Sequence, residues 1–249
     1  YTKVSKRWVP YTLSAEQKQK RVQMAEVLYG DIVNESGNNY ANLATMNESW
    51  MYFEYLIMTQ WVPAGTARPQ AARTTIHTKK IMLRAVLTGT EFWLLDFKTE
   101  IGGIDLKYFT EVVLSAIQDD MRILLESLID RVRLHMDNAP SYNSKATNWF
   151  LTESIFERIP HPLYSPDLAP CDFWLFEELK GMMRGKKFAE LNELSQFCSD
   201  FTESQNADKL KSVYEECERC CIQDGLKTPA QGLFRAPELN FFFFLFKTK

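Results

Sequence analysis

Two aspartates in the second half of the chain lie where carboxylates can hold a metal ion. Asp137 follows a short apolar segment and begins a turn, and Asp172 begins a helical segment after a proline-rich loop. The 34 residues between them leave room for one helix, one strand and a return, so both carboxylates can meet at one edge of a sheet. A hard cation such as Mg²⁺ prefers oxygen ligands of this kind. The spacing alone leaves open the alternative that both residues are ordinary caps.

The elements that would position these residues are predicted from hydrophobic periodicity. Apolar residues at helical spacing predict helices over residues 14–30, 105–128, 144–152 and 172–183. Runs of β-favouring residues predict strands over 43–55, 80–87, 91–97, 133–136 and 155–159, the second and third forming a hairpin. A hairpin sheet continued by strands that alternate with helices is an α/β fold, a mixed sheet flanked by helices. Sites in such sheets lie at the carboxyl ends of strands.

Composition describes an ordinary globular protein. The 249 residues are 45% hydrophobic and 24% charged, which excludes a disordered or fibrous chain. The formal net charge of −3 argues by itself against a dedicated nucleic-acid-binding module, because such modules are usually basic. No apolar run approaches the roughly 18 residues of a membrane span, so no membrane association is expected. Residues 181–186 are one residue short of a phosphate-binding loop and follow a helix, so no nucleotide triphosphate site is expected either.

The chain has an odd number of cysteines, five. An odd number in a chain of this length fits a reducing compartment better than a disulfide framework. The five residues are Cys171, Cys198, Cys217, Cys220 and Cys221. The last three have half of a zinc-site spacing, but no second Cys or His pair follows them, so thiols on a helix are the favoured interpretation.

Several motifs in the expected order resemble those of mariner-type transposases. Two segments resemble the signatures of the second and third catalytic aspartates, which that family also separates by 34 residues. They are RLHMDNA at 133–139 and HPLYSPDLAPCDFWLF at 161–176. The motif TMNESW at 45–50 resembles the segment that carries the first catalytic aspartate of that family. WVPYTL at 8–13 is similar to the linker before the catalytic domain, and KGMMRGKKF at 180–188 to the basic stretch after the third aspartate.

The resemblance implies an RNase H-like fold and DNA transposition with integration, by two-metal phosphoryl transfer. Three carboxylates hold two Mg²⁺ (or Mn²⁺) ions in that family, and they correspond here to residue 47, Asp137 and Asp172. The resemblance also implies transposon-end DNA as partner, a nuclear location, and a homodimer with contacts through Trp8, Val9 and Pro10. It divides the chain into a linker and helix (1–40), an RNase H-like catalytic domain (41–225) and a divergent Phe-rich tail (226–249).

Position 47 departs from the family pattern, because Asn47 stands where the family has Asp. An amide brings no negative charge, so we expect an impaired active site that binds Mg²⁺ or Mn²⁺ weakly if at all. Glu48 is adjacent, but it should face the opposite side of the strand. Asp96, near the end of the third strand, is a further candidate ligand without other support.

Two further features concern DNA contacts, the first a departure from the family and the second in keeping with it. The family carries two helix-turn-helix modules before the linker, and none is recognisable here, so binding to transposon ends is expected to need such N-terminal modules. Basic residues gather at Lys79 and Lys80 with Arg84, and in a second cluster formed by Lys180, Arg184, Lys186 and Lys187. The second cluster is the predicted DNA-binding set, and both clusters are equally consistent with a solvated surface.

His135 shares a strand face with Asp137, and a packed histidine is favoured over one that orients a ligand. Three functional interpretations remain open at this point. The chain is a transposase domain with crippled catalysis, a catalytically inactive DNA-binding or dimerisation module derived from a transposon, or an active nuclease with a substitute metal ligand.

Overall fold

The computed structural model describes residues 13–56, 79–98, 132–139 and 145–222, together with residues 115 and 142. The predicted helix over 105–128, the linker residues Trp8, Val9 and Pro10, and the Phe-rich tail therefore lie outside the described residues. The predicted division into three segments stays a prediction.

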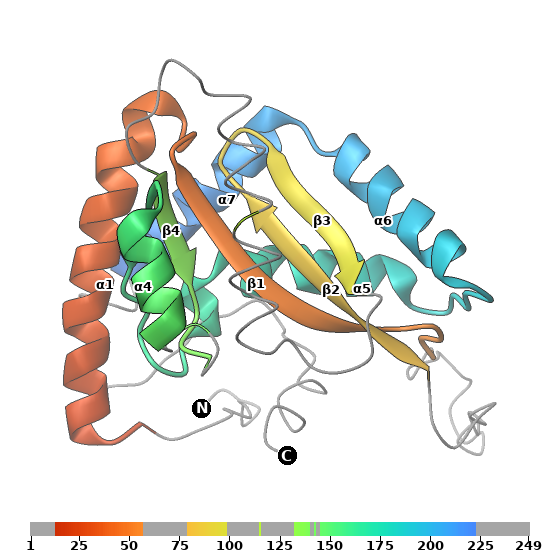
Figure 1. Ribbon diagram of the computed structural model, residues 1–249, viewed down its shortest axis with the longest axis horizontal. Helices are drawn as coiled ribbons and strands as arrows, with labels where there is room; N and C mark the ends of the chain where they lie inside the picture. The colour runs from red at the N-terminus through yellow and green to blue at the C-terminus, as the bar shows by residue number, and fades with distance from the viewer. Residues whose placement is uncertain are drawn as a thin grey trace, which may run out of the picture.

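Five strands form one mixed sheet in the order β3-β2-β1-β4-β5 (Figure 1). The antiparallel part consists of β1 (Leu43–Tyr52), β2 (Lys80–Leu87) and β3 (Phe92–Lys98). The parallel part adds β4 (Val132–Met136) beside β1 and β5 (Phe156–Ile159) beside β4. Both the element order and the mixed sheet agree with the prediction from periodicity. The first strand ends at Tyr52, three residues before the predicted end.

Helices lie on both faces of this sheet (Figure 1). Helix α1 (Ala15–Glu35) begins at a capping box formed by Ser14 and Gln17, as the sequence predicts. Helix α4 (Lys145–Glu153) follows β4 in the chain, and α5 (Phe176–Met183) follows a π-helical turn, Cys171–Leu175. Helices α6 (Leu191–Ser204) and α7 (Ala207–Cys220) complete the described part of the chain.

The alternation of side chains along β1 divides the core into two clusters. Leu43 and Met51 face the larger cluster, which receives apolar residues of α1, α5, α6 and α7. Ala44 and Met46 face a smaller cluster with Leu151 of α4. Because successive strand residues point to opposite faces, each strand contributes to both layers.

Candidate active site

The parallel pairing of β1 and β4 places residue 47 beside residue 137. The last registered pair is Met46 with Met136, so Asn47 and Asp137 are the next residues on neighbouring strands. Beyond this point β4 ends, whereas β1 continues in its pairing with β2. The structure thus brings two of the three predicted site positions to the carboxyl end of the parallel strands.

Asp172 reaches the same place from the π-helical turn before α5. Its backbone N–H donates to the carbonyl of Ala169 at 2.8 Å, which fixes the start of the turn. Its carboxylate Oδ2 accepts a hydrogen bond from Asn47 Nδ2 at 2.8 Å. Positions 47 and 172, far apart in sequence, are therefore in direct contact.

The orientation of the Asn47 amide follows from its two partners. The side chain is 2% exposed, and its Oδ1 accepts the backbone N–H of Glu48 at 2.8 Å. The opposite orientation would set the amide NH₂ against the Glu48 N–H and the amide oxygen against a carboxylate, leaving buried polar groups unsatisfied. The amide therefore presents an N–H group to Asp172, and its only oxygen is already engaged by the backbone.

Asp137 is held in a turn at the end of β4. Its Oδ1 accepts the backbone N–H of Ala139 at 2.8 Å, the pattern by which aspartate stabilises a turn. Its backbone carbonyl accepts from Arg158 Nη2 at 3.2 Å, and Asn138 Nδ2 donates to the carbonyl of His161 at 2.6 Å. These bonds tie the Asp137 turn to β5 and to the segment that follows it.

Further ionisable groups surround the site on both faces of the sheet. Burial, followed by the charges of Glu48 and Asp137, raises the pKa of Tyr142 well above its usual range. Burial, followed by the charge of Asp172, also raises the pKa of the Cys171 thiol. Glu48 lies beside Tyr142, which belongs to the smaller core cluster, whereas Asn47 faces Cys171 and Asp172 on the other side. This placement agrees with the expected alternation along β1.

His135 and His161 form a buried pair behind Asp137. The distance from His135 Nε2 to His161 Nδ1 is 2.9 Å, and both side chains are buried. Burial lowers the pKa of His135 well below its usual range and that of His161 to about 3, so both rings are neutral at pH 7. The two rings pack in the protein interior. This agrees with the interpretation of His135 as a packed histidine.

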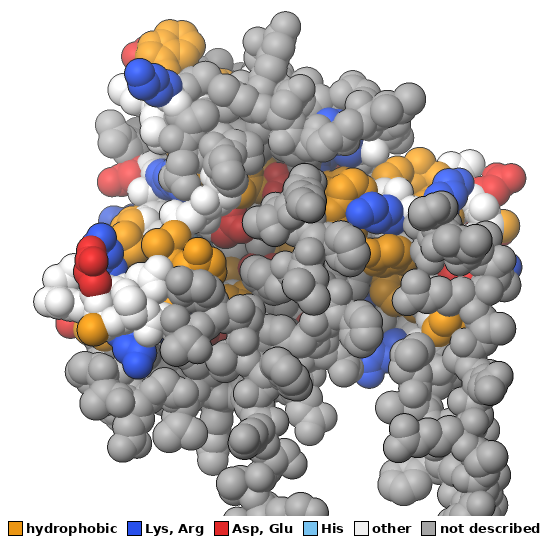
Figure 2. Space-filling view, turned by 90° about the horizontal axis from the view of Figure 1, so that it is seen from below, with side chains coloured by type: hydrophobic (Ala, Val, Ile, Leu, Met, Phe, Trp, Pro, Cys, Tyr) orange, Lys and Arg blue, Asp and Glu red, His pale blue; other side chains and the backbone are white. Residues whose placement is uncertain are grey.

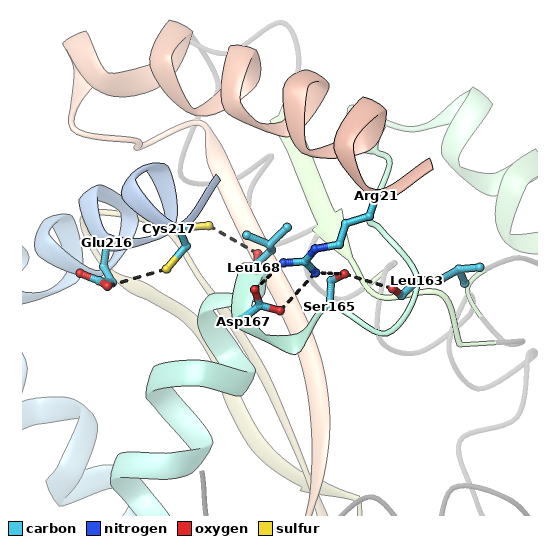
Figure 3. Close-up of polar contacts among 8 residues, drawn as sticks. Arg21, Leu163, Ser165, Asp167, Leu168, Glu216 and Cys217 are labelled. Atoms are coloured by element: carbon cyan, nitrogen blue, oxygen red, sulfur yellow. Dashed lines mark hydrogen bonds and ion pairs between the residues drawn. The ribbon is translucent and has the colours of Figure 1, made fainter. Parts of the chain in front are cut away.

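A buried ion pair that sequence analysis missed anchors the loop before Asp172 (Figure 3). Arg21 of α1 pairs with Asp167 at 2.5 Å, with side chains 5% and 6% exposed, and also donates to the Ser165 hydroxyl. The neighbouring carbonyl of Leu168 accepts from the Cys217 thiol of α7 at 3.4 Å. One signal was available, since Arg21 precedes Ala25 by one helical turn on the apolar face of α1.

The predicted basic residues separate into different environments. Lys180 donates to Ser49 Oγ at 2.5 Å and Arg184 lies 3.8 Å from Glu177, while Lys186 and Lys187 are exposed. Arg84 is buried on β2 and pairs with Asp96 of β3. Asp96 thus forms an ion pair with an arginine on the hairpin. This pairing does not support Asp96 as a metal ligand beside Asp137 and Asp172.

Metal-ligating residues are sparse in the described part of the chain. Within it, no three His, Cys, Asp or Glu residues are grouped so as to hold a metal ion, and this includes the cysteines of α7. All five cysteines are free thiols. A membrane span would need a longer and more apolar helix than any that the structure describes.

Comparison with known proteins identifies relatives of this chain, although no family model matches it. The human histone-lysine N-methyltransferase SETMAR is 26% identical over 225 residues, which are 86% of this chain and 32% of that protein. The Mariner Mos1 transposase of Drosophila mauritiana is 25% identical over 236 residues, which are 88% of this chain and 65% of that protein. The chain thus spans less than two thirds of the length of either relative.

Solved structures of Mos1 transposase have the same fold. A Mos1 paired-end complex with Mn superposes with a TM-score of 0.83 and 20% identity, covering 94% of this chain and 68% of that one. The isolated Mos1 catalytic domain superposes with a TM-score of 0.71 and 19% identity, covering 91% of this chain and 99% of that one. The RNase H-like fold and the resemblance to the catalytic domain of mariner-type transposases, both predicted from sequence motifs, are confirmed.

Proposed function

We propose that this chain is a mariner-type transposase catalytic domain whose metal-dependent phosphoryl transfer is impaired. The hydrogen bond from Asn47 Nδ2 to Asp172 Oδ2 is the observation that carries the proposal. The relatives support the transposase assignment, since one is a mariner transposase and the structural neighbours include Mos1 complexes with a transposon end and with Mn or Mg.

The residues at the site do not fit the pair of divalent ions that the family resemblance implies. Two ions need several anionic oxygens, and here the first position contributes an amide. The Asn47 oxygen is turned towards the Glu48 N–H, so the group that faces Asp172 is an N–H, which has no lone pair to offer a metal. A cation approaching the Asp172 oxygen would also meet the positive end of the amide dipole.

Neither Glu48 nor Asp96, the two candidate substitutes among the described residues, restores the missing charge. Glu48 lies on the other face of β1 beside Tyr142, and Asp96 is paired with Arg84. These contacts disfavour the interpretation of an active nuclease with a replacement carboxylate.

The second candidate function is a catalytically inactive DNA-binding or dimerisation module derived from a transposon. The satisfied Asn47–Asp172 contact favours it, because a carboxylate that is hydrogen-bonded to an amide needs no cation to be stable. DNA as partner is supported by the Mos1 complexes with transposon ends. Homodimerisation through Trp8, Val9 and Pro10 and a nuclear location rest on the sequence resemblance.

Nicking of supercoiled plasmid in Mg²⁺ or Mn²⁺ tests the proposal. We expect no metal-dependent nicking by the wild-type chain, nicking by Asn47→Asp, and none by the matched control Asn47→Asp combined with Asp172→Asn. Wild-type nicking that disappears in Asp172→Asn would contradict the proposed impairment. An Asn47→Asp variant that folds and stays as inert as wild type would show that residue 47 is not its cause.

A further inference from the structure

We propose that four lysines at the far end of β1 form a single surface that binds the phosphate backbone of duplex DNA without sequence preference. This lysine strip consists of Lys79, Lys80, Lys186 and Lys187. The proposal rests on the proposed function only in taking DNA as the polyanion. It requires neither metal binding nor catalysis.

Backbone hydrogen bonds join the two pairs of lysines, although about a hundred residues separate them in sequence. The N–H of Phe53 donates to the carbonyl of Lys79 at 3.0 Å, and the N–H of Phe188 donates to the carbonyl of Phe53 at 2.8 Å. An antiparallel bridge between Glu54 and Lys187 continues the second pairing. Residues 53–55 therefore lie between the two lysine pairs, like the middle strand of a small sheet.

This arrangement sets the spacing of the two rows of positive charge. Adjacent hydrogen-bonded strands lie about 4.8 Å apart, so the backbones of the two lysine pairs are at most about 10 Å apart. The minor and major grooves of B-DNA are about 6 Å and 12 Å wide. Flexible lysine side chains on two such rows can reach phosphates on both sides of one groove.

Aromatic rings hold three of the ammonium groups in place. Lys79 Nζ lies 4.2 Å from the Phe53 ring centroid, and Lys80 Nζ lies 4.1 Å from that of Trp50. Lys186 Nζ lies 5.4 Å from the Phe197 ring centroid. Such contacts restrict the lysine stems but leave the positive charge in place for an anion.

The charge balance of the strip differs from that of the other lysine-bearing surfaces. Lys20 and Lys211 pair with carboxylates one turn away on α1 and α7. Among the described residues, no carboxylate forms an ion pair with Lys79, Lys186 or Lys187. Glu54 faces Lys187 across the bridge, so the strip retains a net positive charge in a chain whose formal charge is −3.

The surface around the strip mixes basic and apolar side chains. Figure 2 shows Lys and Arg side chains among hydrophobic ones on the right-hand side of that view, the side on which β1 ends in Figure 1. All four lysines are exposed. An exposed basic surface fits a repeating backbone of phosphates, whose binding depends on charge rather than on base identity.

Fluorescence anisotropy with a labelled duplex of arbitrary sequence, in EDTA, tests the strip. If four phosphates are neutralised, affinity falls with a log–log salt slope of about −3.6, or about 150-fold between 50 and 200 mM salt. Replacing one lysine in each row, Lys79→Gln with Lys186→Gln, should halve the slope and reduce that loss to about 12-fold. Lys79→Arg with Lys186→Arg should restore the wild-type slope, because it keeps both charges.

The matched control is Lys20→Gln with Lys211→Gln, which removes the same charge from ion-paired positions on α1 and α7. It should retain the wild-type slope. Equal slopes for the strip variant and this control would overturn the proposal. So would a strong preference of the wild type for duplex RNA that is lost in the strip variant, since RNA would then be the partner. Because EDTA removes metal, this outcome is independent of the nicking experiment.

Discussion

Replacing Arg21 by methionine should destabilise the fold strongly, because it breaks an ion pair that is almost completely buried. Arg21 and Asp167 have side-chain exposures of 5% and 6%, and their atoms approach to 2.5 Å. The substitution would leave the Asp167 carboxylate buried without its counter-charge and remove a donor to Ser165. Breaking a buried pair on one side costs about 3–5 kcal/mol, a large share of a typical stability of about 5–15 kcal/mol.

Urea denaturation followed by circular dichroism measures this cost. We expect Arg21→Met to lower the free energy of unfolding by about 4 kcal/mol. The double variant Arg21→Met with Asp167→Leu should lose much less than the sum of the two single losses, because no isolated charge remains in the core. Lys20→Met is the matched control, since Lys20 is exposed and its ion pair with Glu16 lies at the surface. It should leave the midpoint unchanged.

Two results would refute this reasoning. One is a loss below about 1 kcal/mol for Arg21→Met, which is the range of exposed ion pairs. The other is additivity of the two single substitutions, which would mean that Arg21 and Asp167 do not interact. Either would also remove the proposed anchor of the loop that leads to Asp172.

Two further predictions concern pH and a close backbone approach. The pKa of His161 is about 3 in the folded protein, against an ordinary value of 6.5. Between these two pH values the histidine is protonated in the unfolded chain but not in the folded one, so the free energy of unfolding should fall as pH drops from about 6.5 towards 3. The fall should be about 1.4 kcal/mol per pH unit for each such histidine, and urea midpoints for His161→Gln should show a shallower pH dependence than wild type. A Cβ at Gly89 would overlap the backbone oxygen of Asn39, so Gly89→Ala should cost about 1–3 kcal/mol. Gly30→Ala has open space inside α1 and should stabilise the protein by about 0.5–1 kcal/mol, so equal thermal shifts for the two variants would contradict the packing described here.

Local patterns were enough to predict the sheet. The apolar runs that became β1, β2 and β3, and the change of period afterwards, depend on neighbouring residues only. The positions of Asp137 and Asp172 were predictable for the same reason, because each follows a recognisable break in the pattern. The π-helical turn at Cys171–Leu175 was not, since it differs from an α-helix only in its hydrogen bonding.

Contacts between distant segments could not be predicted from one sequence. Nothing near Arg21 indicates that its partner is Asp167, and nothing near Lys79 indicates that Lys186 lies across from Phe53. The orientation of the Asn47 amide likewise depends on Asp172, which lies far along the chain. These features follow from how the layers pack, which a single sequence does not encode in any local pattern.

Calorimetric titration of Mn²⁺ into the purified wild-type chain and into Asn47→Asp tests the central claim most directly. Asn47→Asp would place two carboxylates in contact, a pair that a divalent cation relieves. We predict that Asn47→Asp binds Mn²⁺ saturably and loses this binding when Asp172→Asn is added. The wild-type chain should show no Mn²⁺ binding that Asp172→Asn removes. Equal Mn²⁺ affinity of wild type and Asn47→Asp, abolished in both by Asp172→Asn, would contradict the account.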